Sequence, residues 1–142
     1  MKLRALDRAR RRHLAAGLWH LARARALHAL WPAPRIMARL RAPMPPGRAQ
    51  PPDPALMGWA LAALGRRVPW RADCLVQALA ARLWAERSGT AAALRLGAHR
   101  GASGLVAHAW LEVGGMPVSG GAPSASLRMF DAAEGPQDAE MH

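Results

Sequence analysis

The sequence is short of cysteine, of acidic residues and of long apolar runs, and each shortage excludes a class of protein. Cys74 is the only cysteine among 142 residues, so the chain can form neither an internal disulfide nor a thiolate cluster for structural zinc. No apolar run approaches the roughly 18 to 20 residues that span a bilayer, and no small-residue cleavage site closes the apolar stretch after Leu14. We therefore expect one domain with an appendage in a reducing, cytoplasmic setting.

Acidic residues are scarcest at the start of the chain. Residues 1–50 contain twelve basic side chains and one acid, Asp7, whereas later in the chain eight arginines meet eight acids. The formal net charge of +11 therefore arises in the N-terminal part. Two interpretations stay open: a coding bias towards arginine, or a docking element in residues 1–41 for a protein partner or a membrane surface. Nucleic-acid binding ranks third and is not expected, because the basic segment has no interleaved stacking aromatics.

Prolines mark the boundaries of the expected elements. Leucines at helical spacing predict a helix from Leu3 to Trp31, which Pro32 ends, followed by a short turn over 36–40. Prolines crowd the next segment and predict an extended linker. The predicted organisation is a basic helical region at 1–41, a linker at 42–54, a catalytic core at 55–131 and a disordered tail at 132–142.

The period of the apolar residues changes from about 3.6 to 2 after Gly89. Before it, we expect helices at 55–67 and from Cys74, with Asp73 as the N-cap and Gly89 as the stop. After it, the predicted strands are 94–99, 105–113 and 116–119, with a hairpin turn at Gly114–Gly115. The fold class is therefore α+β, a small antiparallel sheet with helices before it.

The predicted strand 105–113 has two different faces. Its odd positions are all apolar and should face the core, whereas His108, Trp110 and Glu112 share the opposite face. In papain-like and transglutaminase-like enzymes, a cysteine at a helix start is the nucleophile and a histidine on a strand is the base. Taken alone the pattern is weak, because a lone cysteine is usually a small buried apolar residue.

The residues around both positions resemble one family. Val68-Pro69-Trp70-Arg71-Ala72-Asp73-Cys74-Leu75-Val76-Gln77-Ala78-Leu79-Ala80, then Leu94-Arg95-Leu96-Gly97, then Ala107-His108-Ala109-Trp110-Leu111-Glu112-Val113 are similar to blocks of the lasso peptide leader peptidases, a branch of the transglutaminase-like superfamily. The resemblance covers about residues 55–121. It implies a transglutaminase-like core in which Cys74 is the nucleophile and His108 the base.

The resemblance also implies a substrate and partners. The reaction would be hydrolysis of the bond between leader and core in a lasso peptide precursor, through a thioester on Cys74. A leader-recognition protein and a cyclase resembling asparagine synthetase would act with it. The residues imply no cofactor and no metal, and the sequence leaves dependence on ATP open.

The sequence departs from the family at the third catalytic position. The family aspartate falls on Gly120, which cannot orient an imidazole. Ser119 and Asp131 are the remaining candidates, and whether Ser119 faces His108 depends on the hairpin register. Trp110 is a candidate for the substrate channel or for the core. The enzyme could run on a dyad, or the chain could be a catalytically impaired scaffold that binds precursor and cyclase.

Overall fold

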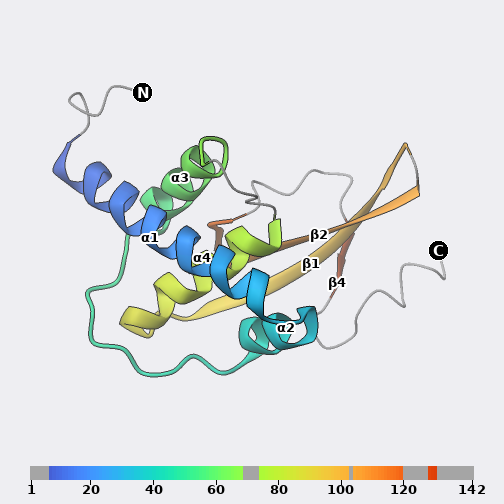
Figure 1. The fold of residues 1–142 in the computed structure, drawn as a ribbon, viewed down its shortest axis with the longest axis horizontal. Helices are drawn as coiled ribbons and strands as arrows, with labels where there is room; N and C mark the ends of the chain where they lie inside the picture. Colours follow the sequence, from blue (N-terminus) through green and yellow to red (C-terminus); the bar gives the residue numbers. More distant parts are fainter. Residues whose placement is uncertain (1–6, 69–73, 103, 120–127, 131–142) are drawn as a thin grey trace.

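A computed structural model describes residues 7–68, 74–102, 104–119 and 128–130, with only the backbone of 99–101, 105–107 and 128–130. Four helices precede a sheet (Figure 1). The elements are α1 (Arg8–Leu30), α2 (Ala33–Arg41), α3 (Pro54–Gly65), α4 (Cys74–Ser88), β1 (Ala92–Gly101), β2 (Gly104–Val113), β3 (Met116–Pro117) and β4 (Arg128–Phe130). This arrangement confirms the predicted α+β class.

Caps and prolines define the helix ends. The carboxylate of Asp7 accepts a hydrogen bond from the backbone N–H of Arg10 at 2.8 Å, and Pro32 follows α1 closely. Asp53 caps α3 in the same way, by accepting from Ala55 N–H at 2.9 Å. The predicted first helix is confirmed, but it begins at Arg8 instead of Leu3, because Asp7 is its N-cap. The short turn expected at 36–40 is in fact the longer helix α2, because Pro32 and Pro34 lie at its start, where their missing N–H groups cost nothing.

The described strands form one antiparallel sheet in the order β3-β2-β1-β4. Gly114 and Gly115 have φ angles of 60° and 78°, as the predicted two-residue hairpin turn requires. Strand β4 was not predicted. It is three residues long and pairs with Leu96–Ala98 of β1, so it has no apolar period that the sequence could reveal.

The core lies between the helices and one face of the sheet. In Figure 1, α1 crosses in front of α4, and α4 in turn contacts β2. Leu111 and Val113 of β2 are buried in the same cluster as Leu79 of α4, and Ala109 packs against it, which confirms for the described side chains that the odd positions of this strand face the core.

Helix α1 belongs to this core. Leu14, Leu21 and Ala24 on its inner side are buried, and the helix contacts both α3 and α4. The predicted domain boundaries stay a prediction, but the apolar core is continuous across those at 41 and 54. A docking role of residues 1–41 stays a prediction, and it would fall to the outer side of α1.

The proline-rich segment between α2 and α3 is held against α4. Arg82 is 2% exposed and donates to the carbonyls of Leu40 at 3.3 Å and Pro43 at 3.1 Å. Its Nε also donates to Glu86, which binds Arg39 through two further hydrogen bonds. Burial raises the pKa of Glu86, but the hydrogen bonds from Arg39 and Arg82 outweigh it, so that the pKa lies below its ordinary value. The network joins α2, the linker and α4.

Glycines allow the same segment to approach the end of α4. The backbone N–H of Ala49 donates to the carbonyl of Arg87 at 2.9 Å. A Cβ on Gly47 would lie 2.4 Å from that carbonyl oxygen and 2.5 Å from the nitrogen of Gly89. Gly89 itself has a φ of 71° and ends α4, as predicted. The linker is therefore a packed part of the fold.

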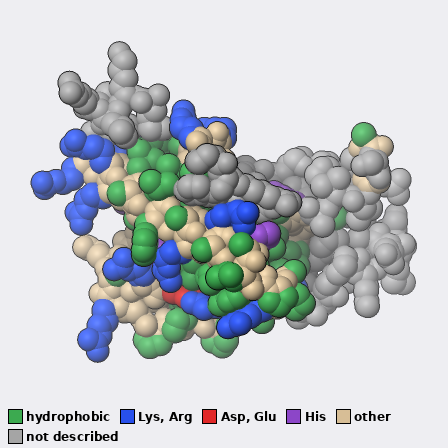
Figure 2. All heavy atoms as spheres, viewed as in Figure 1, with side chains coloured by type: hydrophobic (Ala, Val, Ile, Leu, Met, Phe, Trp, Pro, Cys, Tyr) green, Lys and Arg blue, Asp and Glu red, His purple; other side chains and the backbone are tan. Residues whose placement is uncertain are grey.

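The outer face of α1 is apolar and basic. Leu18, Trp19 and Leu30 are 43%, 59% and 78% exposed, and arginines occupy its first turn. Figure 2 shows basic side chains spread over the visible side of the molecule, with very little acidic surface between them. Within the described residues, no helix is both long and apolar enough to cross a membrane.

Candidate functional site

Cys74 is the first residue of α4 and is half-buried. A helix start leaves backbone N–H groups unpaired, so the thiol lies at the positive end of the helix dipole. The predicted N-cap, Asp73, lies outside the described residues. The amide of Gln77, one turn further on, lies so close to α3 that a Cβ on Gly65 would come within 2.7 Å of Nε2. Gln77 is therefore directed towards α3.

His108 lies in the middle of β2, opposite Gly97 of β1. Its ring stacks on that of Trp110, with centroids 5.7 Å apart and an interplanar angle of 27°. Trp110 donates from Nε1 to the carboxylate of Glu112 at 3.0 Å, and Arg95 of β1 donates to the same carboxylate at 3.3 Å. The imidazole therefore stands at one end of a row of side chains along one face of the sheet.

This face is not the one that packs against the helices. His108 alternates with Ala109 and Leu111, and Leu111 belongs to the core cluster that includes α4. Within the described part of the chain, no hydrogen bond joins the imidazole to the thiol of Cys74. The structure thus brings the helix of the nucleophile onto the strand of the base, and the direct pairing of the two groups stays a prediction.

The register places one candidate for the third position. Ser119 is 4% exposed, and its hydroxyl oxygen accepts from the backbone N–H of Leu111 at 2.9 Å. Extending the pairing of β3 with β2 puts Ser119 opposite Trp110, on the face of His108. Its role as an orienter remains a prediction. Gly120 and Asp131 lie outside the described residues.

Trp110 is fully buried. Its indole contacts His108 and Glu112, so in this structure it fixes the face on which the imidazole lies and has no surface to offer to a channel. A contribution to a substrate channel stays a prediction that would require this part of the sheet to open.

Sequence reasoning missed Arg95 as a member of this row. The alternation of Leu94, Arg95 and Leu96 indicates that Arg95 faces away from the core, but its partner depends on the register of β1 against β2. It likewise missed the buried Arg82, although an arginine within an otherwise apolar α4, four residues before Glu86, is a signal for a buried ion pair. Among the described residues, no three histidine, cysteine or acidic side chains lie close enough to hold a metal ion.

Comparison with known proteins assigns the class of this fold. The family model described as the transglutaminase-like superfamily matches residues 6–131, and the chain belongs to that superfamily. The match begins before α1 and includes Cys74 and His108. The superfamily includes cysteine peptidases. No curated protein and no solved structure matches the chain significantly.

Proposed function

We propose that this protein is a cysteine peptidase that removes the leader from a lasso peptide precursor. The observation that carries the proposal is that Cys74 begins the helix that contacts β2, the strand of His108. Membership of the transglutaminase-like superfamily supports the peptidase chemistry. The sequence blocks around both residues support the narrower substrate.

In this mechanism His108 takes the proton of the Cys74 thiol, and the thiolate attacks the carbonyl that ends the leader. The imidazolium then protonates the amine of the core peptide, which leaves, and the leader remains as a thioester on Cys74. Water, deprotonated by His108, hydrolyses the thioester and regenerates the thiol. The backbone N–H of Cys74 is the donor that we assign to the oxyanion, because Gln77 is directed towards α3.

The proposed partners are the precursor, a leader-recognition protein and a cyclase resembling asparagine synthetase. The outer face of α1, formed by Leu18, Trp19 and Leu30 among arginines, supports docking of a protein partner there. The basic charge of residues 1–41 would suit an acidic surface on that partner.

The first test is mass analysis of a candidate precursor incubated with this protein and a leader-recognition protein. Cys74→Ala should abolish leader removal, and His108→Ala should slow it by on the order of two decades. His28→Ala, in the C-terminal half of α1, is the matched control. This variant should cleave the precursor at the normal rate. Full cleavage by Cys74→Ala would exclude the peptidase assignment.

A scaffold that binds precursor and cyclase without cleaving is the second candidate. The observation that favours it is that His108 stacks on Trp110, on the face of β2 turned away from the helical core. Alkylation of Cys74 by iodoacetamide distinguishes the two candidates. A peptidase should react faster than its His108→Ala variant near neutral pH, whereas a scaffold should react at the same rate with and without the imidazole.

A further inference from the structure

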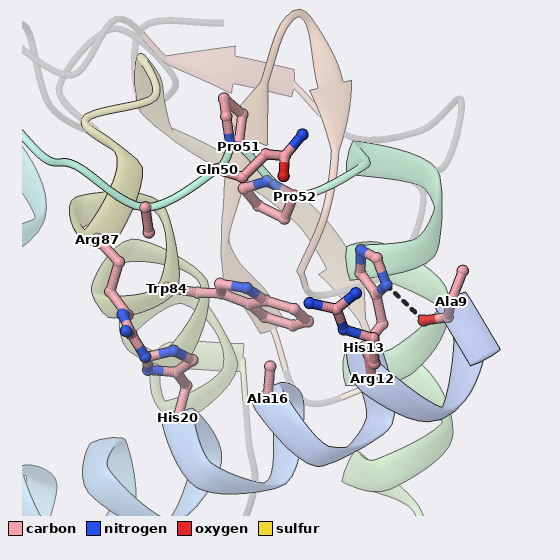
Figure 3. Close-up of a pocket in the computed structure, with 11 residues that line it drawn as sticks. Ala9, Arg12, His13, Ala16, His20, Gln50, Pro51, Pro52, Trp84 and Arg87 are labelled. Atoms are coloured by element: carbon pink, nitrogen blue, oxygen red, sulfur yellow. Dashed lines mark hydrogen bonds between the residues drawn. The ribbon is translucent and has the colours of Figure 1, made fainter.

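A pocket of about 410 Å³ lies at the other end of α4 from Cys74 (Figure 3). Trp84, in its wall, follows Cys74 by ten residues, which is about 15 Å along a helix axis. The pocket is therefore separate from the site described above. Its lining comes from the first half of α1, the linker segment 49–52 and the last turns of α4: Ala9, Arg12, His13, Ala16, His20, Ala49, Gln50, Pro51, Pro52, Trp84 and Arg87.

The charge of this pocket is of one sign. Arg12 from α1 and Arg87 from α4 contribute guanidinium groups, and none of the described residues that line the pocket is acidic. Both arginines are exposed, and in the described part of the chain neither forms an ion pair with a carboxylate. The excess positive charge in the lining of the pocket favours an anionic ligand.

The wall of the pocket is flat and apolar. The indole of Trp84 is 6% exposed and forms the central surface in Figure 3, with the rings of Pro51 and Pro52 across the pocket from it. A flat apolar body placed between them would bury its own surface. The volume is in the range of pockets that bind small molecules.

The imidazole of His20 gives the pocket a hydrogen-bonding group without a partner. His20 is 1% exposed and stacks on Trp84 at 5.7 Å, and neither of its ring nitrogens has a hydrogen-bond partner among the residues that the structure describes. A buried polar group left unpaired is costly. In Figure 3, His20 lies beside Arg87 at one end of the indole, while Arg12 and His13 lie at the other end.

We propose that this pocket binds a flat organic anion, such as an aromatic carboxylate, sulfonate or phosphate ester. Its anionic group lies at the His20–Arg87 end, where it accepts a hydrogen bond from the imidazole and pairs with the guanidinium. Its apolar body lies along Trp84, towards Arg12. This proposal does not depend on the proposed peptidase activity, because it concerns binding at the opposite end of α4.

The test is calorimetric titration of the full chain with 1-naphthalenesulfonate, which is an anion on a flat body. Two compounds serve as control ligands. The uncharged 1-naphthalenesulfonamide has the flat body without the charge, and inorganic sulfate has the charge without the body. The sulfonate should bind at least about tenfold more tightly than either, because a charge-assisted hydrogen bond and stacking act together. Equal binding of the sulfonamide would overturn the proposal.

Matched variants locate the site. Arg87→Ala should weaken binding of the sulfonate by on the order of tenfold, and Arg12→Ala by less. Arg11→Ala and Arg66→Ala remove the same charge from exposed positions outside the pocket and should leave affinity unchanged. An equal loss in all four variants would mean that only the overall charge matters, and would overturn the proposal.

A second readout uses the titration of His20 itself. Burial, and then the charges of Arg23 and Arg87, lower its pKa to about 4 in the free protein, and Arg12 and His13 line the same pocket. A bound anion should raise that pKa, so the affinity of the sulfonate should increase as pH falls towards 4. Nuclear magnetic resonance of the imidazole reports both effects. An unchanged titration of His20 at saturating sulfonate would contradict binding at this end of the pocket.

Discussion

Among the described titratable groups that form no ion pair, His20 is the most deeply buried. Its ring lies between α1 and Trp84 of α4, is 1% exposed, and has no hydrogen-bond partner for either nitrogen. Burial is the largest cause of its lowered pKa, and the positive charges of Arg23 and Arg87 act in the same direction. The folded protein therefore keeps this imidazole neutral under conditions in which an exposed histidine is charged.

This difference predicts that the stability depends on pH in mildly acidic solution. The pKa is 6.5 in the unfolded chain and about 4 in the folded one, so between these values the unfolded chain binds the proton more readily. The contribution of His20 to stability is complete above pH 6.5 and is lost as pH falls towards 4. Denaturant titrations should show a loss of about 2 kcal/mol from His20 between about pH 7.5 and about pH 5.

His20→Phe is the control for this effect, because it keeps a ring against Trp84 and removes the titration. Its free energy of unfolding should change much less over the same pH range, whatever its absolute stability. A variant with the same pH slope as the natural chain would assign the acid sensitivity to other groups.

At the scale of elements, the backbones of the linker and of α4 lie closer together than a residue with a Cβ would allow. Gly47 lies against the backbone of Arg87 and Gly89, with 2.4 Å between an added Cβ and the Arg87 carbonyl oxygen. Gly47→Ala should therefore displace the linker and break the hydrogen bond from Ala49 to Arg87. We expect a loss of about 1 to 3 kcal/mol of unfolding free energy, measured by thermal or chemical denaturation.

Gly58→Ala provides the matched comparison. A Cβ there would make ordinary contacts at 3.4 Å, and Gly58 lies inside α3, where alanine is the better helix former. Its stability should be equal to that of the natural chain or higher. If both variants were equally stable, the close approach at Gly47 would have no energetic role.

The elements could be predicted where local patterns define them. Asp7, Pro32 and Gly89 mark helix ends by rules that need no tertiary contact, and the alternation from Leu105 to Val113 gives the strand and its core face. Strand β4 could not be predicted, because Arg128–Phe130 is too short to show a period and pairs with residues about thirty positions away.

The candidate site was predictable in its residues and not in its geometry. The local sequence marks Cys74 and His108 as candidates, and the alternation places Trp110 and Glu112 on the same face of the strand as the imidazole. Whether α4 packs on the same face of the sheet as His108 or on the opposite face depends on long-range packing. The pocket at Trp84 arises in the same way, because α1, the linker and α4 meet there from distant parts of the chain.

At the scale of the whole molecule, the basic N-terminal part and the site-bearing part share one core. Removing residues 1–50 would expose the surfaces of α3 and α4 that Leu14, Leu21 and Ala24 cover. A chain that starts at Pro51 should therefore lose its cooperative unfolding transition by circular dichroism. A sharp transition near that of the full chain would show that residues 1–41 are a separable docking element.

Substitutions at two leucines of α1 distinguish the packing role of this helix from a docking role. Leu21 is fully buried and Leu18 is 43% exposed, one helical turn apart. Leu21→Ala should cost about 2 to 5 kcal/mol of unfolding free energy, whereas Leu18→Ala should cost less than about 0.5 kcal/mol. If Leu18→Ala instead weakens precursor processing at normal stability, the outer face of α1 is the docking surface.

The position of α1 also matters during translation. It is synthesised before its partners α3 and α4 and before β2, the strand behind α4. At ordinary elongation rates the roughly eighty residues between the end of α1 and Val113 take roughly 4 to 16 seconds. During that time only α2 and α3 can cover part of the inner side of this arginine-rich helix, and α4 and β2 cannot yet complete the core over it. The nascent protein should therefore depend on a chaperone before the thiol-bearing helix exists.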